Sequence, residues 1–160
     1  MFLSCICKKK SKPDDNSFLD EIGWKDTQTF TVPITSGKVI KVYDGDTITI
    51  ANKLPIKDSP IYRFSVRLNG IDTPEIKSKH EAEKKLAKEA KQFLSDIILG
   101  NIIELRDVKT EKYGRILATV YYNNENMNQL MIDSKHALPY DGGTKTIPDE
   151  WKDSPFHLNV

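Results

Sequence analysis

The order of apolar patterns along the chain is the feature that most constrains its fold. Three short runs of alternating apolar and polar residues come first, and in the third, YRFSVRLNGI, Phe64, Val66 and Leu68 share one face. This period of two residues indicates half-buried strands. Residues 80–99 carry apolar side chains at helical spacing, two more alternating runs follow, and a short helical pattern covers residues 127–137. We therefore predict a mainly β protein with helices (α+β): a five-stranded OB-type Greek-key β-barrel capped by a long helix and a shorter one.

Length and composition are typical of one globular domain rather than a disordered or membrane-spanning chain. The 160 residues are 38% hydrophobic and 29% charged, and a chain of this length can bury a core of its own. Residues 1–30 show no sustained periodicity, so we expect a flexible N-terminal tail there and a single domain over residues 31–160. No apolar run approaches the roughly 20 residues of a membrane-spanning helix. Because the formal net charge is only +1, a polyanionic ligand would have to be held by locally placed Arg and Lys side chains.

The first residues contain both cysteines of the chain and a basic run. The opening MFLSCIC is too short for the apolar part of a secretory signal and lysines follow it, so we expect an intracellular, cytoplasmic protein. A disulfide between Cys5 and Cys7 would be strained, and no nearby His completes a zinc site. The pair is either two exposed thiols or, beside Lys8–Lys10, a lipidated and polybasic anchor for peripheral membrane attachment. We expect a monomer in either case.

Charged residues gather at turns between the predicted strands, where a rigid barrel can aim them at one point. Two carboxylates from separate turns, with a carbonyl and waters, can form an all-oxygen site for a hard cation such as calcium. Arginines match the shape of a phosphate and the charge of its transition state, and a further glutamate can take a proton from an attacking water. Together these are the parts of a phosphodiesterase. The residues are Asp44 and Asp46 in YDGDT, Arg67 in VRLNG, Asp72 and Glu75 in DTPE, and Arg115 in KYGR.

The first of these groups also has a structural interpretation, which the sequence leaves open. Asp44 and Gly45 lie between β-branched runs, a strong signal for a hairpin turn with positive φ at its centre. In that case Asp44 serves the turn alone. Asp46 lies past the turn residues and is less well explained in this way.

The other groups have structural alternatives as well. DTPE fits a capping box, with Asp72 as the N-cap of the following helix and Glu75 as its partner three residues on, and this is as good an explanation as a ligand role. Arg67 and Arg115 could each be solvated residues on the polar face of a strand. No single group decides between structure and chemistry.

The order of the motifs along the chain is more specific than any one of them. The succession DGDT, RLNGIDTPE, a helix and KYGR resembles the staphylococcal nuclease family, the thermonucleases, from about Gly37 to Tyr140. The resemblance implies an OB barrel capped by helices and calcium-dependent hydrolysis of DNA and RNA, single-stranded or unpaired regions above all, leaving 3′-phosphate ends. The chain departs from the family prototype near its end, where DGGTKTIPDEW cannot form a third long helix because it contains two adjacent glycines and a proline.

The alternative to a nuclease is a non-catalytic OB-fold module for nucleic-acid binding or protein interaction. A nucleic-acid module would need stacking aromatics on one barrel face. Tyr62, Phe64, Tyr121 and Tyr122 are available for it, although Phe64 falls on the apolar face.

The resemblance to the nuclease family also implies a role for nine residues. Carried over by position, the implied metal ligands are Asp46, Asp72 and the Thr73 carbonyl; the catalytic residues are Arg67, Glu75 and Arg115; and the substrate-binding residues are Lys112, Tyr113 and Tyr140.

Overall fold

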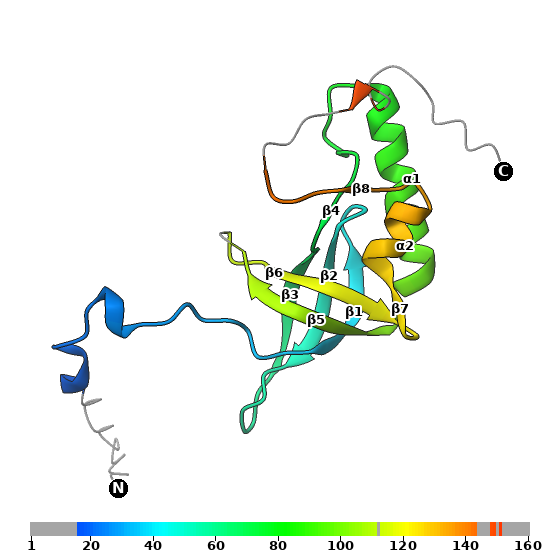
Figure 1. The fold of residues 1–160 in the computed structure, drawn as a ribbon. Helices are drawn as coiled ribbons and strands as arrows, with labels where there is room; N and C mark the ends of the chain where they lie inside the picture. The colour runs from blue at the N-terminus through cyan, green and yellow to red at the C-terminus, as the bar shows by residue number, and fades with distance from the viewer. Residues whose placement is uncertain (1–15, 112, 144–147, 150, 152–160) are drawn as a thin grey trace, which may run out of the picture.

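The structure is a computed structural model that describes residues 16–111, 113–143, 148–149 and 151 (Figure 1). Cys5, Cys7 and Lys8–Lys10, on which the membrane-anchor hypothesis rests, lie outside the described residues, and so does Lys112. The described N-terminal segment contains two 3-10 turns, Ser17–Leu19 and Trp24–Asp26, and extends away from the barrel (Figure 1). Among the described helices, none is long and apolar enough to cross a membrane.

Five strands close into a barrel, as the alternating pattern predicts. They are β1 (Ser36–Val42), β2 (Thr47–Lys53), β3 (Ile61–Leu68), β5 (Ile102–Thr110) and β6 (Ile116–Tyr122). The pairs β1–β2, β2–β3, β1–β5 and β5–β6 are antiparallel, and a parallel pairing of β3 with β6 closes the ring. This is the strand order of an OB barrel, so the predicted fold class is confirmed.

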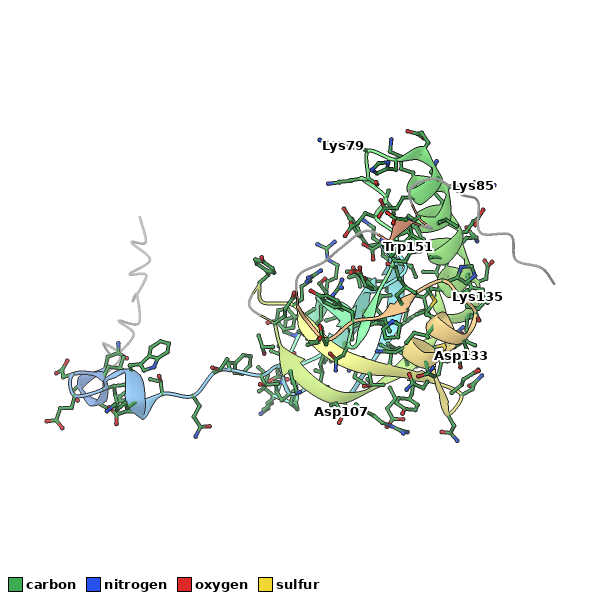
Figure 2. The ribbon with its side chains drawn as sticks, turned by 45° about the horizontal axis from the view of Figure 1, so that its top comes forward. Lys79, Lys85, Asp107, Asp133, Lys135 and Trp151 are labelled. Atoms are coloured by element: carbon green, nitrogen blue, oxygen red, sulfur yellow. The ribbon has the colours of Figure 1, made fainter. Side chains whose placement is uncertain are left out.

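Three short strands that the sequence pattern does not reveal add to this frame. β7 (Glu125–Asn126) extends the sheet next to β6, while β4 (Ile71–Asp72) pairs with β8 (Leu138–Pro139) in a separate two-stranded sheet. β8 ends at Pro139, shortly before the DGG residues, while residues 144–147 lie outside the description. Trp151 is buried, at 3% exposure, and lies beside the long helix (Figure 2).

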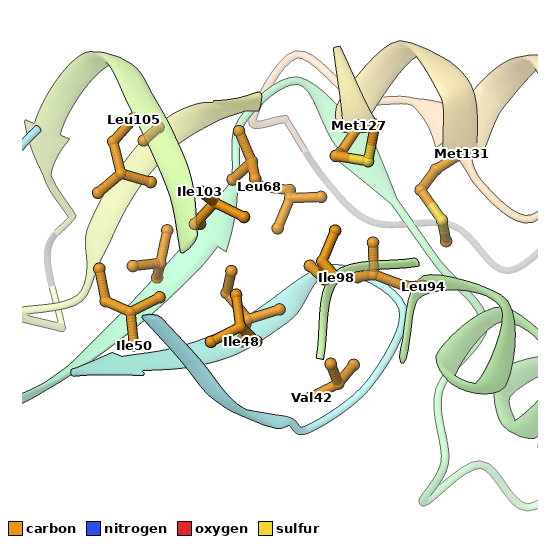
Figure 3. Close-up of a cluster of buried hydrophobic side chains, with 14 of the residues drawn as sticks. Val42, Ile48, Ile50, Leu68, Leu94, Ile98, Ile103, Leu105, Met127 and Met131 are labelled. Atoms are coloured by element: carbon orange, nitrogen blue, oxygen red, sulfur yellow. The ribbon is translucent and has the colours of Figure 1, made fainter. Parts of the chain in front are cut away.

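Two helices cover one side of the barrel (Figure 1). They are α1 (Glu81–Ile98) and α2 (Met127–Asp133). Leu94 and Ile98 of α1 and the two methionines of α2 meet Val42 and the barrel core (Figure 3). Burial of each such side chain stabilises the fold by about 1.5–3 kcal/mol relative to exposure. The fully buried barrel positions include Ile48, Ile50, Val66, Leu68 and Ile103, the inward face of the alternating runs.

The capping box that the sequence left open as an alternative at DTPE does not form. Asp72 belongs to β4, where its backbone pairs with Leu138, and α1 does not begin until Glu81, with His80 as its N-cap. Residues 73–80 are turns and irregular structure. The motif has the residue types of a cap, but pairing with β8 holds its first residue in a short strand.

Candidate active site

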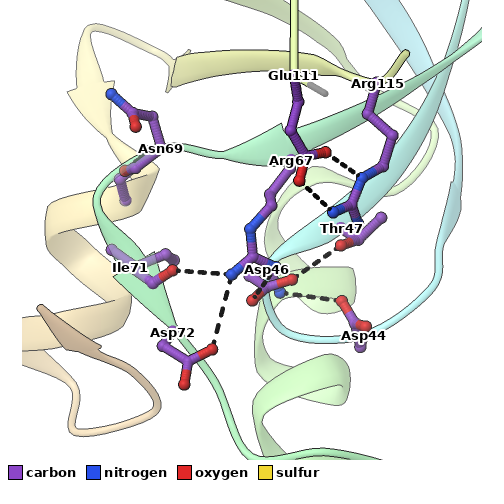
Figure 4. Close-up of polar contacts among 10 residues, drawn as sticks. Asp44, Asp46, Thr47, Arg67, Asn69, Ile71, Asp72, Glu111 and Arg115 are labelled. Carbon is purple, nitrogen blue, oxygen red and sulfur yellow. Dashed lines mark hydrogen bonds and ion pairs between the residues drawn. The ribbon is translucent and has the colours of Figure 1, made fainter. Parts of the chain in front are cut away.

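A buried ion pair between β2 and β3 forms the centre of the charged site. Asp46 comes directly before β2 and is only 3% exposed. Its Oδ2 lies 2.7 Å from Nη1 of Arg67, which projects from β3, and its Oδ1 accepts a hydrogen bond from the Thr47 hydroxyl at 2.8 Å (Figure 4). Both oxygens of the carboxylate are therefore engaged, as a buried charged group requires.

The same arginine reaches the second predicted aspartate. Nη2 of Arg67 lies 3.6 Å from Oδ1 of Asp72 and donates a hydrogen bond to the Ile71 carbonyl at 3.4 Å (Figure 4). Asp72 is 6% exposed and Thr73 is 2% exposed. One guanidinium thus lies between two buried carboxylates, one from the turn before β2 and one from β4. The structure therefore brings together Asp46, Arg67, Asp72 and the adjoining Thr73.

The turn that carries Asp46 is built differently from the hairpin that the sequence predicts. No described residue of the turn has positive φ, so Gly45 is not required for a left-handed conformation, and that part of the turn prediction is wrong. Gly45 is required for close packing: an added Cβ would lie 2.9 Å from Cγ2 of Thr73 and 3.0 Å from Cβ of Ala90 on α1. Asp44 does serve the turn, because its Oδ1 accepts the Asp46 N–H at 3.2 Å.

This packing makes Gly45→Ala an expected destabilising substitution. The extra methyl would push against Thr73 and the buried helix residue Ala90, and overpacking of this kind costs about 1–3 kcal/mol. Chemical denaturation would measure the change in the free energy of unfolding. Gly23→Ala is the matched control, because its added Cβ meets only Asp26 Oδ2 at 3.4 Å. Equal stabilities of the two variants would contradict the packing role of Gly45.

The charged form of the Asp46 carboxylate is disfavoured in the folded protein, chiefly because the group is buried. Burial raises the pKa of Asp46 to about 6, and the neighbouring Asp44 adds to the rise, while Arg67 and Thr47 only partly oppose it. A cation bound to the carboxylate would stabilise that charged form. In the described part of the chain, no three His, Cys, Asp or Glu side chains form a metal-binding group. A cation here would therefore have to complete its shell with a backbone carbonyl and water.

The second predicted arginine is held by a residue that sequence reasoning missed. Arg115 makes two charged hydrogen bonds to Glu111, from Nε at 2.6 Å and from Nη2 at 2.8 Å (Figure 4). These bonds raise the pKa of Arg115, and the charges of Asp46 and Asp44 add to the rise, which places Arg115 within electrostatic reach of the aspartate turn. The only sequence signal for Glu111 is its place four residues before Arg115 in EKYGR.

A cleft of about 610 Å³ opens beside these groups. Arg67, Glu111 and Tyr140 contribute to its wall. The Tyr140 hydroxyl donates to the Gly143 carbonyl at 2.7 Å, and Tyr113 is 73% exposed. Two of the three predicted substrate residues are therefore described, one in the cleft wall and one at the surface, while Lys112 is outside the description. The remaining lining residues are Leu68, Asn69, Gly70, Ile71, Leu117, Asp141 and Gly142.

Glu75 lies where the chain leaves the barrel. It follows the buried Asp72, Thr73 and Pro74 and is itself exposed. Its backbone N–H donates to Oε1 of Glu83 at 3.0 Å. The structure thus gives this glutamate an exposed position on a tethered backbone, directly after the buried aspartate cluster.

The fold and the site together define the class of protein to which this chain belongs. It is an OB-barrel protein with a charged site in which one arginine lies between two buried aspartates. A protein-family model described as "Staphylococcal nuclease homologue" matches residues 65–148, just over half of the chain. The chain belongs to the staphylococcal nuclease family. The matched range contains Arg67, Asp72, Glu75 and Arg115 and begins after Asp46.

Curated relatives agree with this assignment. The chain is 34% identical over 94 residues to a thermonuclease of Staphylococcus hyicus, covering 58% of this chain and 52% of the relative. It is 34% identical over 103 residues to an uncharacterized endonuclease of Haemophilus influenzae, covering 64% and 51%. An uncharacterized protein of Bacillus anthracis is 36% identical over 105 residues, covering 64% and 46%. The chain thus spans about half the length of these relatives.

Proposed function

We propose that this protein is a calcium-dependent nuclease that hydrolyses phosphodiester bonds of DNA and RNA. The observation that carries the proposal is the buried cluster in which Arg67 lies between Asp46 and Asp72, 2.7 and 3.6 Å from their oxygens. Membership of the staphylococcal nuclease family supports it, and so do the printed names thermonuclease and endonuclease of relatives.

The donors at this cluster suit calcium better than a softer metal. Asp46, Asp72 and the Thr73 carbonyl would hold the ion, and all three are oxygen donors, the kind that hard cations prefer. The raised pKa of Asp46 supports a cation here, since it reflects chiefly the burial of the carboxylate and then the nearby Asp44, which Arg67 and Thr47 oppose only in part. When bound, calcium would neutralise charge on a phosphate oxygen.

The two arginines and Glu75 would perform the remaining steps. Arg67 and Arg115 would donate hydrogen bonds to phosphate oxygens, where charge increases as water attacks. Glu75 would orient the attacking water and accept its proton. Tyr140 in the cleft wall, the exposed Tyr113 and, by position in KYGR, Lys112 would contact the nucleotide. A single strand presents its bases and phosphates to such a cleft more readily than a duplex, so unpaired regions are the expected substrates.

Calcium removal tests this function directly. We expect purified protein to cleave labelled single-stranded DNA and RNA in millimolar calcium, to lose that cleavage in excess EGTA, and to recover it when calcium is restored. The physical reason is that two buried carboxylates would otherwise repel the phosphate. Asp46→Asn should raise the calcium concentration needed for half-maximal cleavage. Tight binding of the DNA or the RNA without cleavage in calcium would contradict the proposal and favour a binding-only module.

The aromatic surface gives that alternative less support. Arg106 covers the ring of Tyr121, with its guanidinium carbon 3.8 Å from the ring centroid. Tyr122 and Phe64 pack in part against the core. Of the four aromatic candidates only Tyr62, at 41% exposure, is an exposed ring, whereas stacking surfaces use several exposed rings in succession.

A further inference from the structure

Glu83 is a fully buried glutamate in the first turn of α1. Its exposed fraction is 0%, which is rare for a glutamate. Oε1 accepts the backbone N–H of Glu75 at 3.0 Å, whereas Oε2 is buried without a hydrogen-bond partner among the described residues. Burial of a charged carboxylate is costly unless hydrogen bonds compensate it. This residue therefore stays buried in spite of a cost that an apolar side chain would avoid.

The helix start shows that this contact replaces an ordinary cap. Glu83 is the third residue of α1 after the N-cap His80, the position whose carboxylate commonly accepts the N-cap N–H. Here the His80 N–H donates to the Ser78 hydroxyl at 3.1 Å instead. The Glu83 carboxylate is thereby left to reach back across the turns to Glu75.

The backbone of Glu75 is consequently held on both sides. Its N–H donates to Glu83, and its carbonyl accepts the Ser78 N–H at 3.1 Å. A cavity of about 390 Å³ lies among these residues, with Lys77 and Lys79 in its wall, and Figure 2 shows Lys79 at the end of the molecule where α1 begins. The helix itself is anchored in the core, so Glu83 connects a rigid element to the loop.

We propose that Glu83 is a positioning residue for Glu75: its carboxylate fixes the Glu75 backbone so that the Glu75 side chain is held toward the phosphodiester site. The inference rests on the proposed catalytic role of Glu75. A glutamate on an untethered loop would occupy its working position for only part of the time, and misplacement by about 1 Å can cost roughly 100-fold in rate.

The first experiment compares Glu83→Leu with Glu83→Gln in the full-length chain, on a labelled single-stranded DNA with saturating calcium. Leucine removes the acceptor, and we expect kcat to fall about 10- to 100-fold while KM changes less than about twofold. Glutamine keeps an oxygen acceptor for the Glu75 N–H and should restore most of kcat. Glu81→Gln is the matched control, because Glu81 lies exposed in the same turn and pairs with Lys84. A loss in KM alone, or equal kcat losses for both Glu83 variants, would overturn the proposal.

A double-variant cycle separates this inference from the proposed function. If Glu83 acts through Glu75, Glu83→Leu should cost little further activity in a Glu75→Gln background. Multiplied losses in that background would refute the positioning role while leaving Glu75 catalytic. If Glu75→Gln alone leaves kcat unchanged, the role of Glu75 fails and the positioning inference fails with it.

Amide exchange tests the contact without any substitution, in case Glu83→Leu does not fold. We expect the Glu75 amide of the wild-type protein to exchange far more slowly than the amides of the exposed residues Lys77 and Lys79, because its hydrogen bond must open first. NMR-detected exchange in calcium-free buffer measures this rate. Exchange of the Glu75 amide as fast as that of its exposed neighbours would overturn the proposal.

Discussion

Glu75→Gln is expected to reduce kcat about 100- to 10,000-fold, the usual contribution of a general base. The substitution keeps the size of the side chain and the backbone hydrogen bond to Glu83, but an amide cannot accept a proton from water. Nucleotide affinity and the calcium requirement should change little, since Glu75 is not among the proposed cation ligands. Single-turnover cleavage of an oligonucleotide, together with inhibition by a nucleotide, would measure the two effects separately.

The control for this prediction is a second exposed glutamate that lies elsewhere in the chain. Glu81→Gln changes an exposed carboxylate at the start of α1 and should leave kcat at the wild-type value. Glu75→Asp should recover part of the activity, because it restores a base on a shorter side chain. Wild-type turnover by Glu75→Gln would show that the attacking water is activated by another group.

Arg115→Ala is expected to reduce kcat about 100- to 1,000-fold, as removal of one preorganised donor to a developing negative charge does in other enzymes. Arg115→Lys should retain only part of the wild-type activity, because an ammonium group keeps the charge but not the planar pair of donors. Cleavage rates at saturating substrate would measure both. Near-normal cleavage by Arg115→Ala would refute the role of this arginine as a phosphate donor.

Glu111 complicates this measurement, and the structure shows how to correct for it. Its two hydrogen bonds to Arg115 are 2.6 and 2.8 Å long, so Arg115→Ala leaves a carboxylate in the cleft wall that would repel phosphate. The double variant Arg115→Ala/Glu111→Gln removes that repulsion. We expect it to recover substrate affinity but not kcat, because the missing donor acts on the transition state.

The barrel could be predicted because its signals are local. Alternation in YRFSVRLNGI is a property of neighbouring residues, and the inward face that it predicts is the buried face of β3, with Val66 and Leu68 fully buried. The long helix was equally evident from its spacing, and its bounds differ from the prediction by one residue at each end. Gly100 follows it with a φ of 82°, as a helix-ending glycine should.

The charged cluster could be predicted only in part. The motifs identified Asp46, Arg67 and Asp72, and the structure brings all three into one buried group. The sequence could not show that Glu111 accepts hydrogen bonds from Arg115, because only the folded turn brings the two side chains together. Nor could it distinguish a capping box from a strand at DTPE, because the deciding partner, Leu138, comes much later in the chain.

The sequence by itself determined the order of the strands, the place of the helix, and the residue types available at each turn, because these depend on side-chain periodicity and on neighbours a few residues away. Tertiary structure alone decided what each turn residue does. Gly45 serves the approach of Thr73 and Ala90 rather than positive φ, and Glu83 holds Glu75 rather than capping its own helix. The first role depends on segments far apart in the chain, which meet only after the barrel closes. The second depends on how the turns between Glu75 and Glu83 fold back, which a periodic pattern does not specify.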